Sequence, residues 1–139
     1  MQSITLGLEG NSLGEGGAKA LAKLKVLGLR SLTLGLTGNS IGADGAKALA
    51  SLKGSSTLQS LTLTLGRNSI GDDGANVLAT LKECSTLQSI THELWGNRVG
   101  EDGAKSFGLV EAVLGFAKSY HWPGGQPASV LIVPRLLPH

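Results

Sequence analysis

Glycine-rich segments recur along the chain and have the composition of a phosphate-binding loop. Residues 14–19 read GEGGAK, and residues 42–47 read GADGAK. A phosphate-binding loop needs Gly-Lys followed by Ser or Thr, because the lysine reaches the phosphates and the hydroxyl reaches the metal. Here Ala stands between Gly and Lys in both segments. We therefore expect no nucleotide site, and we attribute the recurring glycines to turn geometry.

The histidines and the single cysteine are candidates for metal binding or nucleophilic catalysis. His92, His121 and His139 are far apart, with no His, Cys or carboxylate partner at metal-ligand spacing. His92 takes an inward strand position that leucine fills in the other units, and we interpret it as a tolerated or partly exposed residue. Cys84 lies in a helix-to-strand connection, where we take Ser56 as its equivalent, and no base is evident beside it. The sequence predicts neither a metal site nor a catalytic residue.

Two pairs of carboxylates resemble the acid–base pairs of enzymes. They are Asp72 with Asp73 and Glu101 with Asp102. Both pairs lie where helices are expected to begin, so capping and a favourable interaction with the helix dipole explain them. Within this pattern Asp44, Asp73 and Asp102 occupy the expected N-cap, just before a Gly-Ala start. No cofactor is expected.

These candidates recur because the chain repeats itself. Four segments align, beginning SITLGLEGNS, SLTLGLTGNS, SLTLTLGRNS and SITHELWGNR. Their asparagines are 28, 29 and 29 residues apart, at Asn11, Asn39, Asn68 and Asn97. Such a period indicates a stack of similar supersecondary units.

Each unit begins as a strand and ends as a helix. In the second unit Leu32, Leu34 and Leu36 alternate with small polar residues, which predicts a half-buried strand. A turn of the type G-N-S-I-G follows, and then apolar residues recur with helical spacing. Stacked units would place a parallel sheet on the concave side and helices outside. The recurrent asparagine is expected to satisfy backbone groups where the strand turns inward.

The repeat pattern L-x-L…N-S-I-G-x-D-G-A-K-A-L-A resembles leucine-rich repeats of the ribonuclease-inhibitor type. It is most similar to the repeats at the C-terminal end of NOD-like receptors, over roughly residues 1–108. The resemblance implies an α/β leucine-rich-repeat solenoid, a horseshoe segment of about four repeats. The family's L-x-x-L-x-L-x-x-N is stretched here by two residues before Asn68, so we expect a slightly longer strand or a bulge.

The pattern sets the predicted domain boundaries. We assign residues 1–120 to the repeat domain and residues 121–139 to an irregular Pro-rich tail, which either caps the stack or is an irregular end. The first unit opens directly on a strand, which leads us to expect a longer array or stability assisted by a partner. The predicted units lie near 1–29, 30–58, 59–87 and 88–120.

Composition excludes several classes of partner. The net charge is +2 and the basic residues form no run, so nucleic acid is not expected. No apolar stretch is long enough to span a membrane, so no membrane partner is expected either. The single cysteine fits a reducing compartment, and we expect a cytoplasmic location.

The outward residues of the strands form the predicted contact surface for another protein. Trp95 is its best anchor, with Glu93 beside it and Arg67 and Arg98 near the rim. Alternatively, Trp95 packs against the C-terminal segment. The matched Lys19, Lys47 and Lys105 on the outer helices are read as a solvated face, or as a site for an acidic partner. The predicted contact residues are Thr5, Glu9, Thr33, Thr37, Thr62, Thr64, Arg67, Thr91, Glu93 and Trp95.

The resemblance makes protein–protein recognition the leading function, without catalysis. Two alternatives stay open. One is a GTPase-activating regulator, because Ran GTPase-activating proteins share this repeat type. The other is an incomplete repeat array with no independent activity.

Overall fold

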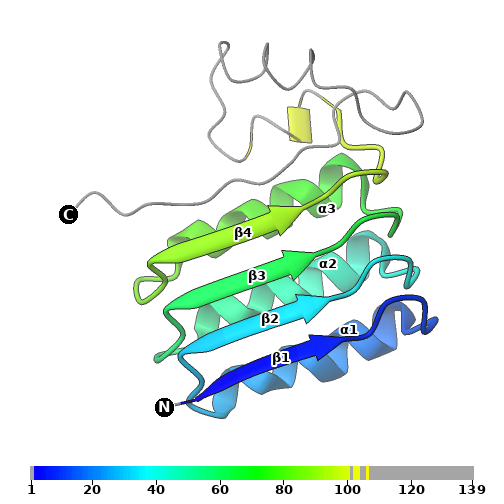
Figure 1. The fold of residues 1–139 in the computed structure, drawn as a ribbon. Coiled ribbons are helices and arrows are strands. Elements are labelled where there is room, and N and C mark those ends of the chain that lie inside the picture. Colours follow the sequence, from blue (N-terminus) through cyan, green and yellow to red (C-terminus); the bar gives the residue numbers. More distant parts are fainter. Residues whose placement is uncertain (1, 101, 104–105, 107–139) are drawn as a thin grey trace.

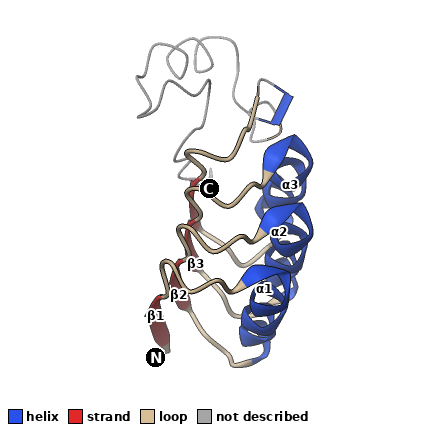
Figure 2. Ribbon diagram, turned by 90° about the vertical axis from the view of Figure 1, so that its right-hand side faces the viewer, coloured by secondary structure: helices blue, strands red, loops and turns tan. Residues whose placement is uncertain are grey.

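The computed structural model describes residues 2–100, 102–103 and 106 and consists of strands in one layer and helices in another (Figures 1 and 2). The strands pair in parallel in sequence order, as β1 (Ser3–Gly7), β2 (Ser31–Gly35), β3 (Ser60–Thr64) and β4 (Ser89–Glu93). The helices α1 (Gly14–Ala22), α2 (Gly42–Ala50) and α3 (Gly71–Leu78) cover one face of the sheet. Each helix tightens into a 3-10 turn, namely η1 (Lys23–Val26), η2 (Ser51–Gly54) and η3 (Ala79–Glu83). This arrangement confirms the predicted α/β solenoid.

The inward side chains of the strands form the core between the two layers. Leu32 pairs with Leu61, and Leu61 with Ile90, so the same level of each unit meets its counterpart in the next. These three side chains are buried. In contrast, the inward residues of β1, such as Ile4 and Leu6, are only half-buried, because no described strand lies on the outer side of β1. Burial of the predicted leucine positions is confirmed for the second to fourth units.

The stretched pattern produces neither a bulge nor a longer assigned strand. Each strand has five residues that pair one to one with those of its neighbour, so the predicted bulge is wrong. The parallel hydrogen bonding nevertheless continues beyond the strand ends. The backbone N–H of Leu36 donates to the carbonyl of Thr64 at 2.8 Å, and that of Gly38 donates to Gly66 at 2.9 Å. The two extra residues therefore hold neighbouring units together up to the asparagine turn.

The recurrent asparagines form a buried ladder along the stack. Asn68 is 0% exposed, and its Oδ1 accepts the backbone N–H groups of Asn39 at 2.9 Å and Ile41 at 3.1 Å. Its Nδ2 donates to the carbonyls of Leu36, Leu65 and Gly66 at 2.8 to 3.0 Å. One side chain thus satisfies five backbone groups in two units, which apolar residues could not do. The expected role of the asparagine is confirmed, and it extends across the unit boundary.

This ladder also replaces the predicted helix caps. The helices α2 and α3 begin at Gly42 and Gly71, whose φ angles are +71° and +67°. Asp44 and Asp73 therefore lie inside the first turn of their helices, and neither helix has a side-chain capping hydrogen bond. Asp102 also lies within helical residues. The predicted N-caps are wrong, because the asparagine of the following unit already binds the backbone N–H before each helix. The acidic side chains still lie at the positive end of the dipole.

The recurring glycines serve two different purposes. Gly42 and Gly71 adopt the left-handed region that favours glycine, so turn geometry explains them as expected. Gly45 and Gly74, inside the helices, are required for packing instead. A Cβ at Gly74 would overlap the side chain of Ile70 and would come within 3.3 Å of the Ala43 backbone. These glycines let each helix lie directly on the preceding turn and helix.

Several predictions fall outside the described residues. They concern the boundary at residue 120, the tail 121–139, and the residues Glu101, Lys105, His121 and His139. Within the described part of the chain, no helix has the length and apolar character needed to cross a membrane.

Candidate functional site

The strand face, formed by the outward residues of β1 to β4 and of the residues just after them, is the surface that the sequence singled out. Its first row consists of threonines brought together by the strand register. Thr5 pairs with Thr33, Thr33 with Thr62, and Thr62 with Thr91. Thr5 is exposed and the other three are half-buried. The structure therefore assembles this predicted row from residues far apart in the sequence.

The second row mixes small and charged residues. Gly7 pairs with Gly35, Gly35 with Thr64, and Thr64 with Glu93. Thr64 and Glu93 are both half-buried. This row therefore changes from bare backbone in the first two units to side chains in the last two.

The third row lies just beyond the strands and is held by the same parallel hydrogen bonding. The N–H of Gly10 donates to Thr37, that of Gly38 to Gly66, and that of Arg67 to Trp95, at 2.9 to 3.0 Å. These bonds align the third row, which consists of Glu9, Thr37, Gly66 and Trp95. The two large side chains of the row thus stand in the first and last units.

The bare glycines of the first two units accommodate the Glu9 side chain. Its Oε1 lies 3.3 Å from the position that a Cβ of Gly7 would take, and its carboxylate lies over Gly35. Gly35 is buried as a result, although it points outward. The first half of the strand face is therefore occupied by a carboxylate folded onto the sheet.

In the second half, Trp95 lies against Gly66 and Arg67. A Cβ at Gly66 would overlap the indole ring of Trp95. The guanidinium carbon of Arg67 lies over the same ring, 5.4 Å from its centroid, which is a cation–π arrangement. The Cγ of Arg67 lies 3.1 Å from the position that a Cβ of Gly96 would take. The predicted neighbours Trp95 and Arg67 are therefore in contact, in the third and fourth units as expected.

The charged residues of this face have no ion-pair partner within the described part of the chain. Arg67 and Arg98 are exposed on the turns that follow β3 and β4. The ion pairs among described residues are Lys19–Glu15 at 2.8 Å and Lys53–Glu83 at 3.6 Å, both away from the strand face. The two arginines therefore keep their charges available at the rim.

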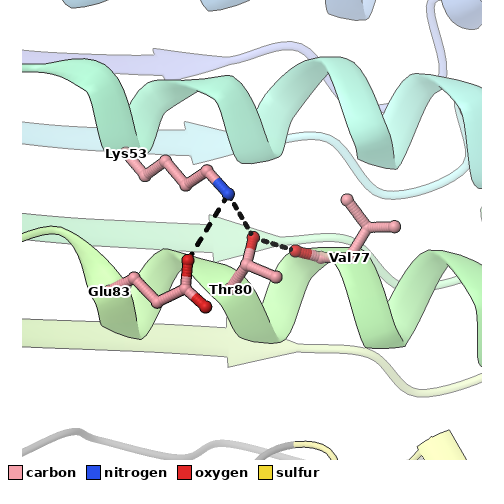
Figure 3. A network of polar contacts seen from close by, with 4 residues as sticks. All are labelled: Lys53, Val77, Thr80 and Glu83. Carbon is pink, nitrogen blue, oxygen red and sulfur yellow. Dashed lines mark hydrogen bonds and ion pairs between the residues drawn. The ribbon is translucent and has the colours of Figure 1, made fainter.

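The helix side carries short surface networks. Lys53 Nζ lies 3.6 Å from Glu83 Oε1 and donates to Thr80 Oγ1 at 3.3 Å, as Figure 3 shows. Thr80 in turn donates to the carbonyl of Val77 at 2.6 Å.

The lysines Lys19 and Lys47, predicted to lie on the outer helices, are both exposed. On α1, the hydrogen bond and the charge of Glu15 raise the pKa of Lys19. Exposed pairs of this kind contribute little to stability, which agrees with a solvated face.

His92 is buried inside the core. It pairs with Leu63 across the sheet and is only 4% exposed, so the predicted partial exposure is wrong. Burial lowers the pKa of His92 to about 4, because the apolar core disfavours the charged imidazolium. The alternation along the strand predicted an inward side chain at this position, whereas the polarity of histidine favoured exposure. The position in the strand determines the burial. His92 is therefore neutral near pH 7.

Cys84 and Asp72 make structural contacts. Cys84 is 4% exposed, and its Sγ lies 3.3 Å from Thr86 Oγ1. The residue at the equivalent position one unit earlier is Ser55, so the predicted equivalence with Ser56 is wrong. Asp72 Oδ1 accepts the N–H groups of Gly100 at 2.6 Å and Gly103 at 3.2 Å. Asp72 therefore binds backbone N–H groups of the following unit and does not cap α3, so the predicted capping of its own helix is wrong. Among the described residues, no group of His, Cys, Asp and Glu could hold a metal ion.

Comparison with known proteins identifies the repeat. The family model for the leucine-rich repeat matches residues 28–50 and residues 55–79. The first match spans β2 and α2, and the second spans β3 and α3. No curated protein matches the chain.

Proposed function

We propose that this chain, a leucine-rich-repeat solenoid, is a protein-interaction module that binds its partner along the strand face. Leucine-rich repeats are generally non-enzymatic binding scaffolds, and the match to their family model supports this role. The observation that carries the proposal is the register of the strand face. Outward residues from four units lie in continuous rows across the sheet, so an extended partner can contact several units at once.

The buried asparagine ladder makes this surface suitable for binding. It fixes each turn to the next, so the rows are ordered before a partner arrives and little conformational entropy is lost on association. The contact residues of the proposal are the ten named from the sequence. The threonines offer hydroxyl groups for hydrogen bonds, while Trp95 provides the large apolar contact that interface hot spots use.

A finer assignment follows from the repeat pattern. The N-S-I-G-A-D-G-A-K-A-L-A segment at residues 39–50 supports a relationship to ribonuclease-inhibitor-type repeats and to the sensing repeats of NOD-like receptors. The single cysteine is a buried free thiol, which supports a reducing compartment such as the cytoplasm. A partner-sensing role inside the cell is therefore the form of the function that we propose.

Selection from a displayed library of random linear peptides tests the proposal. The full chain is immobilised, and the affinities of selected peptides are measured for the chain and for two variants. Thr62→Arg places a bulky side chain in the first row of the strand face, and we expect it to weaken binding by about tenfold or more. Asn76→Arg adds the same side chain to an exposed position of α3 and is expected to leave affinity unchanged.

Two results would contradict the proposal. One is that no peptide is enriched over the uncoated support. The other is that Asn76→Arg weakens binding as much as Thr62→Arg, because the helix side would then be the binding surface.

A further inference from the structure

We propose that Arg67, Arg98 and Trp95 form a binding site for a carboxylate side chain in an extended protein segment. The arginines hold the carboxylate at the rim, and the indole contacts the apolar residue beside it. This inference rests on the proposed function and names the chemistry of the partner.

The site lies where two departures from the repeat pattern meet. Three units place a side chain and then glycine before the asparagine: Glu9-Gly10, Thr37-Gly38 and Trp95-Gly96. The third unit reverses this order, as Gly66-Arg67. The reversal removes the side chain at the place where Trp95 lies and puts Arg67 where its guanidinium covers the ring. The change in the third unit thus matches the tryptophan in the fourth.

The backbone of Arg67 is unfavourable for an arginine. Its φ is +54°, whereas the glycines at this position in the other units have φ of +69°, +70° and +70°. Glycine adopts the left-handed region at no steric cost, while a residue with a Cβ does not. A residue held in such a conformation is a reason to look for a function that depends on its side chain. The side chain of Arg67 is exposed, and its guanidinium lies over the ring of Trp95 in a cation–π arrangement.

The cation–π arrangement leaves the hydrogen-bonding groups of the guanidinium available. The guanidinium carbon lies 5.4 Å from the centroid of the Trp95 ring. This interaction uses none of the guanidinium N–H groups, and these can bind a carboxylate in bidentate fashion. Arg98 lies two residues beyond Gly96, against which the Arg67 side chain packs, and it is also exposed. Neither arginine has an ion-pair partner among the described residues. Two exposed arginines without ion-pair partners among the described residues, on the turns of neighbouring units, fit an anionic group.

The remaining charges limit where that group can bind. Glu93 lies two residues before Trp95 on β4, and Glu9 occupies the first half of the face. Both repel a carboxylate at the level of the strands, so the acidic residue of the partner is confined to the rim of the last units. The same two carboxylates and the net charge of +2 disfavour a nucleic acid, which would need a continuous basic surface. An acidic protein segment is therefore favoured over a nucleic acid.

The test uses peptides selected on the full chain, labelled with fluorescein and measured by fluorescence anisotropy. We expect selected peptides to share an Asp or Glu next to an apolar residue. Arg67→Gly, which restores the glycine of the other units, should weaken their binding by about tenfold, as at a hot spot. Replacing the peptide acid by its amide should weaken binding to the parent chain by a similar factor.

A double-mutant cycle decides whether the two groups act on one another. With Arg67→Gly, the change from acid to amide should weaken binding less than it does with the parent chain, because only Arg98 is then left to bind the carboxylate. Arg30→Gln, at another exposed arginine, serves as the matched control and should leave affinity unchanged. A second variant, Trp95→Thr, should weaken the same peptides, and thermal melts of each variant check that it folds.

The outcomes separate this inference from the function on which it rests. If peptides are selected and Thr62→Arg removes them, but acids are not enriched or the cycle is additive, this inference is wrong and the proposed function stands. If no peptide is selected, the proposed function fails. If a single-stranded oligonucleotide binds more tightly than the peptides and with the same dependence on Arg67, the site binds nucleic acid and the proposed acidic protein segment is wrong.

Discussion

The inward and outward sides of the same four strands differ in how strictly they repeat. Inward, leucine or isoleucine recurs at every position except His92, and the asparagine recurs in every unit. From the second unit on, these side chains are buried. Outward, the third row changes from Glu9 to Thr37, Gly66 and Trp95. The two sides share one backbone and one register, so the contrast arises from what each side chain must contact.

The difference follows from packing. An inward side chain meets its counterparts in neighbouring units, and each asparagine must satisfy backbone groups on both sides, so a change in one unit disturbs the next. An outward side chain meets mostly water and can vary without that constraint. The outward side also shows one set of matched changes. Gly66 leaves the space that the indole ring of Trp95 fills, and the guanidinium of Arg67 lies over that ring.

The largest effect is expected from the asparagine ladder. Asn68→Ala removes the partner of five backbone groups in the interior and should lower the free energy of unfolding by about 4 kcal/mol. Asn11→Ala, at an exposed position where the side chain donates to Leu8 and Glu9, should cost about 1 kcal/mol. Urea denaturation measures both. Equal losses would mean that the ladder stabilises no more than its exposed end does.

His92 tests the inward side at a point where a polar residue replaces leucine. Its pKa is lowered from 6.5 to about 4 in the folded chain, so the unfolded state binds more protons between these values. The free energy of unfolding that depends on His92 is therefore highest above pH 6.5. It falls as the pH drops toward about 4, by up to about 3 kcal/mol.

The variant His92→Leu isolates the contribution of His92 to the pH dependence of stability. It places at this position the leucine that the preceding unit has at Leu63. The free energy of unfolding of the variant relative to the parent should be higher at pH 4 than at pH 7, because only the parent loses stability when His92 is protonated. Denaturant titrations across this range, compared between parent and variant, cancel the contributions of the other titrating groups. If the difference between the two proteins is independent of pH, His92 is not the source of the dependence.

The smallest effect on stability is expected on the outward side. Arg67→Gly relieves the left-handed backbone but loses the cation–π contact with Trp95, and the two terms nearly cancel, so the net change should stay below about 1 kcal/mol. The reverse change in the second unit, Gly38→Arg, has no tryptophan to cover and should destabilise by about 1 kcal/mol. Thermal melts measure both. A large loss with Arg67→Gly would make the arginine a structural residue rather than a binding one.

The sequence was informative wherever one unit could be compared with another. The 28- and 29-residue spacing predicted the parallel register, and alternation predicted which leucines are buried. It was wrong where neighbours in space decide the outcome. Asp44 and Asp73 have the residue type and phase of caps, but the asparagine of the next unit takes that role. The polarity of His92 indicated exposure, but its inward position on β4 buries it.

By itself the sequence determined the fold class, the strand and helix order and the outward rows, because local periodicity and the repeat length are properties of the chain alone. Only the tertiary structure decided which side chains meet across units. Glu9 folds over the glycines of its own and the next unit, and Trp95 lies on Gly66 beneath Arg67. Such contacts depend on the space that a glycine in a neighbouring unit leaves. That space is created by stacking, and no single repeat contains it.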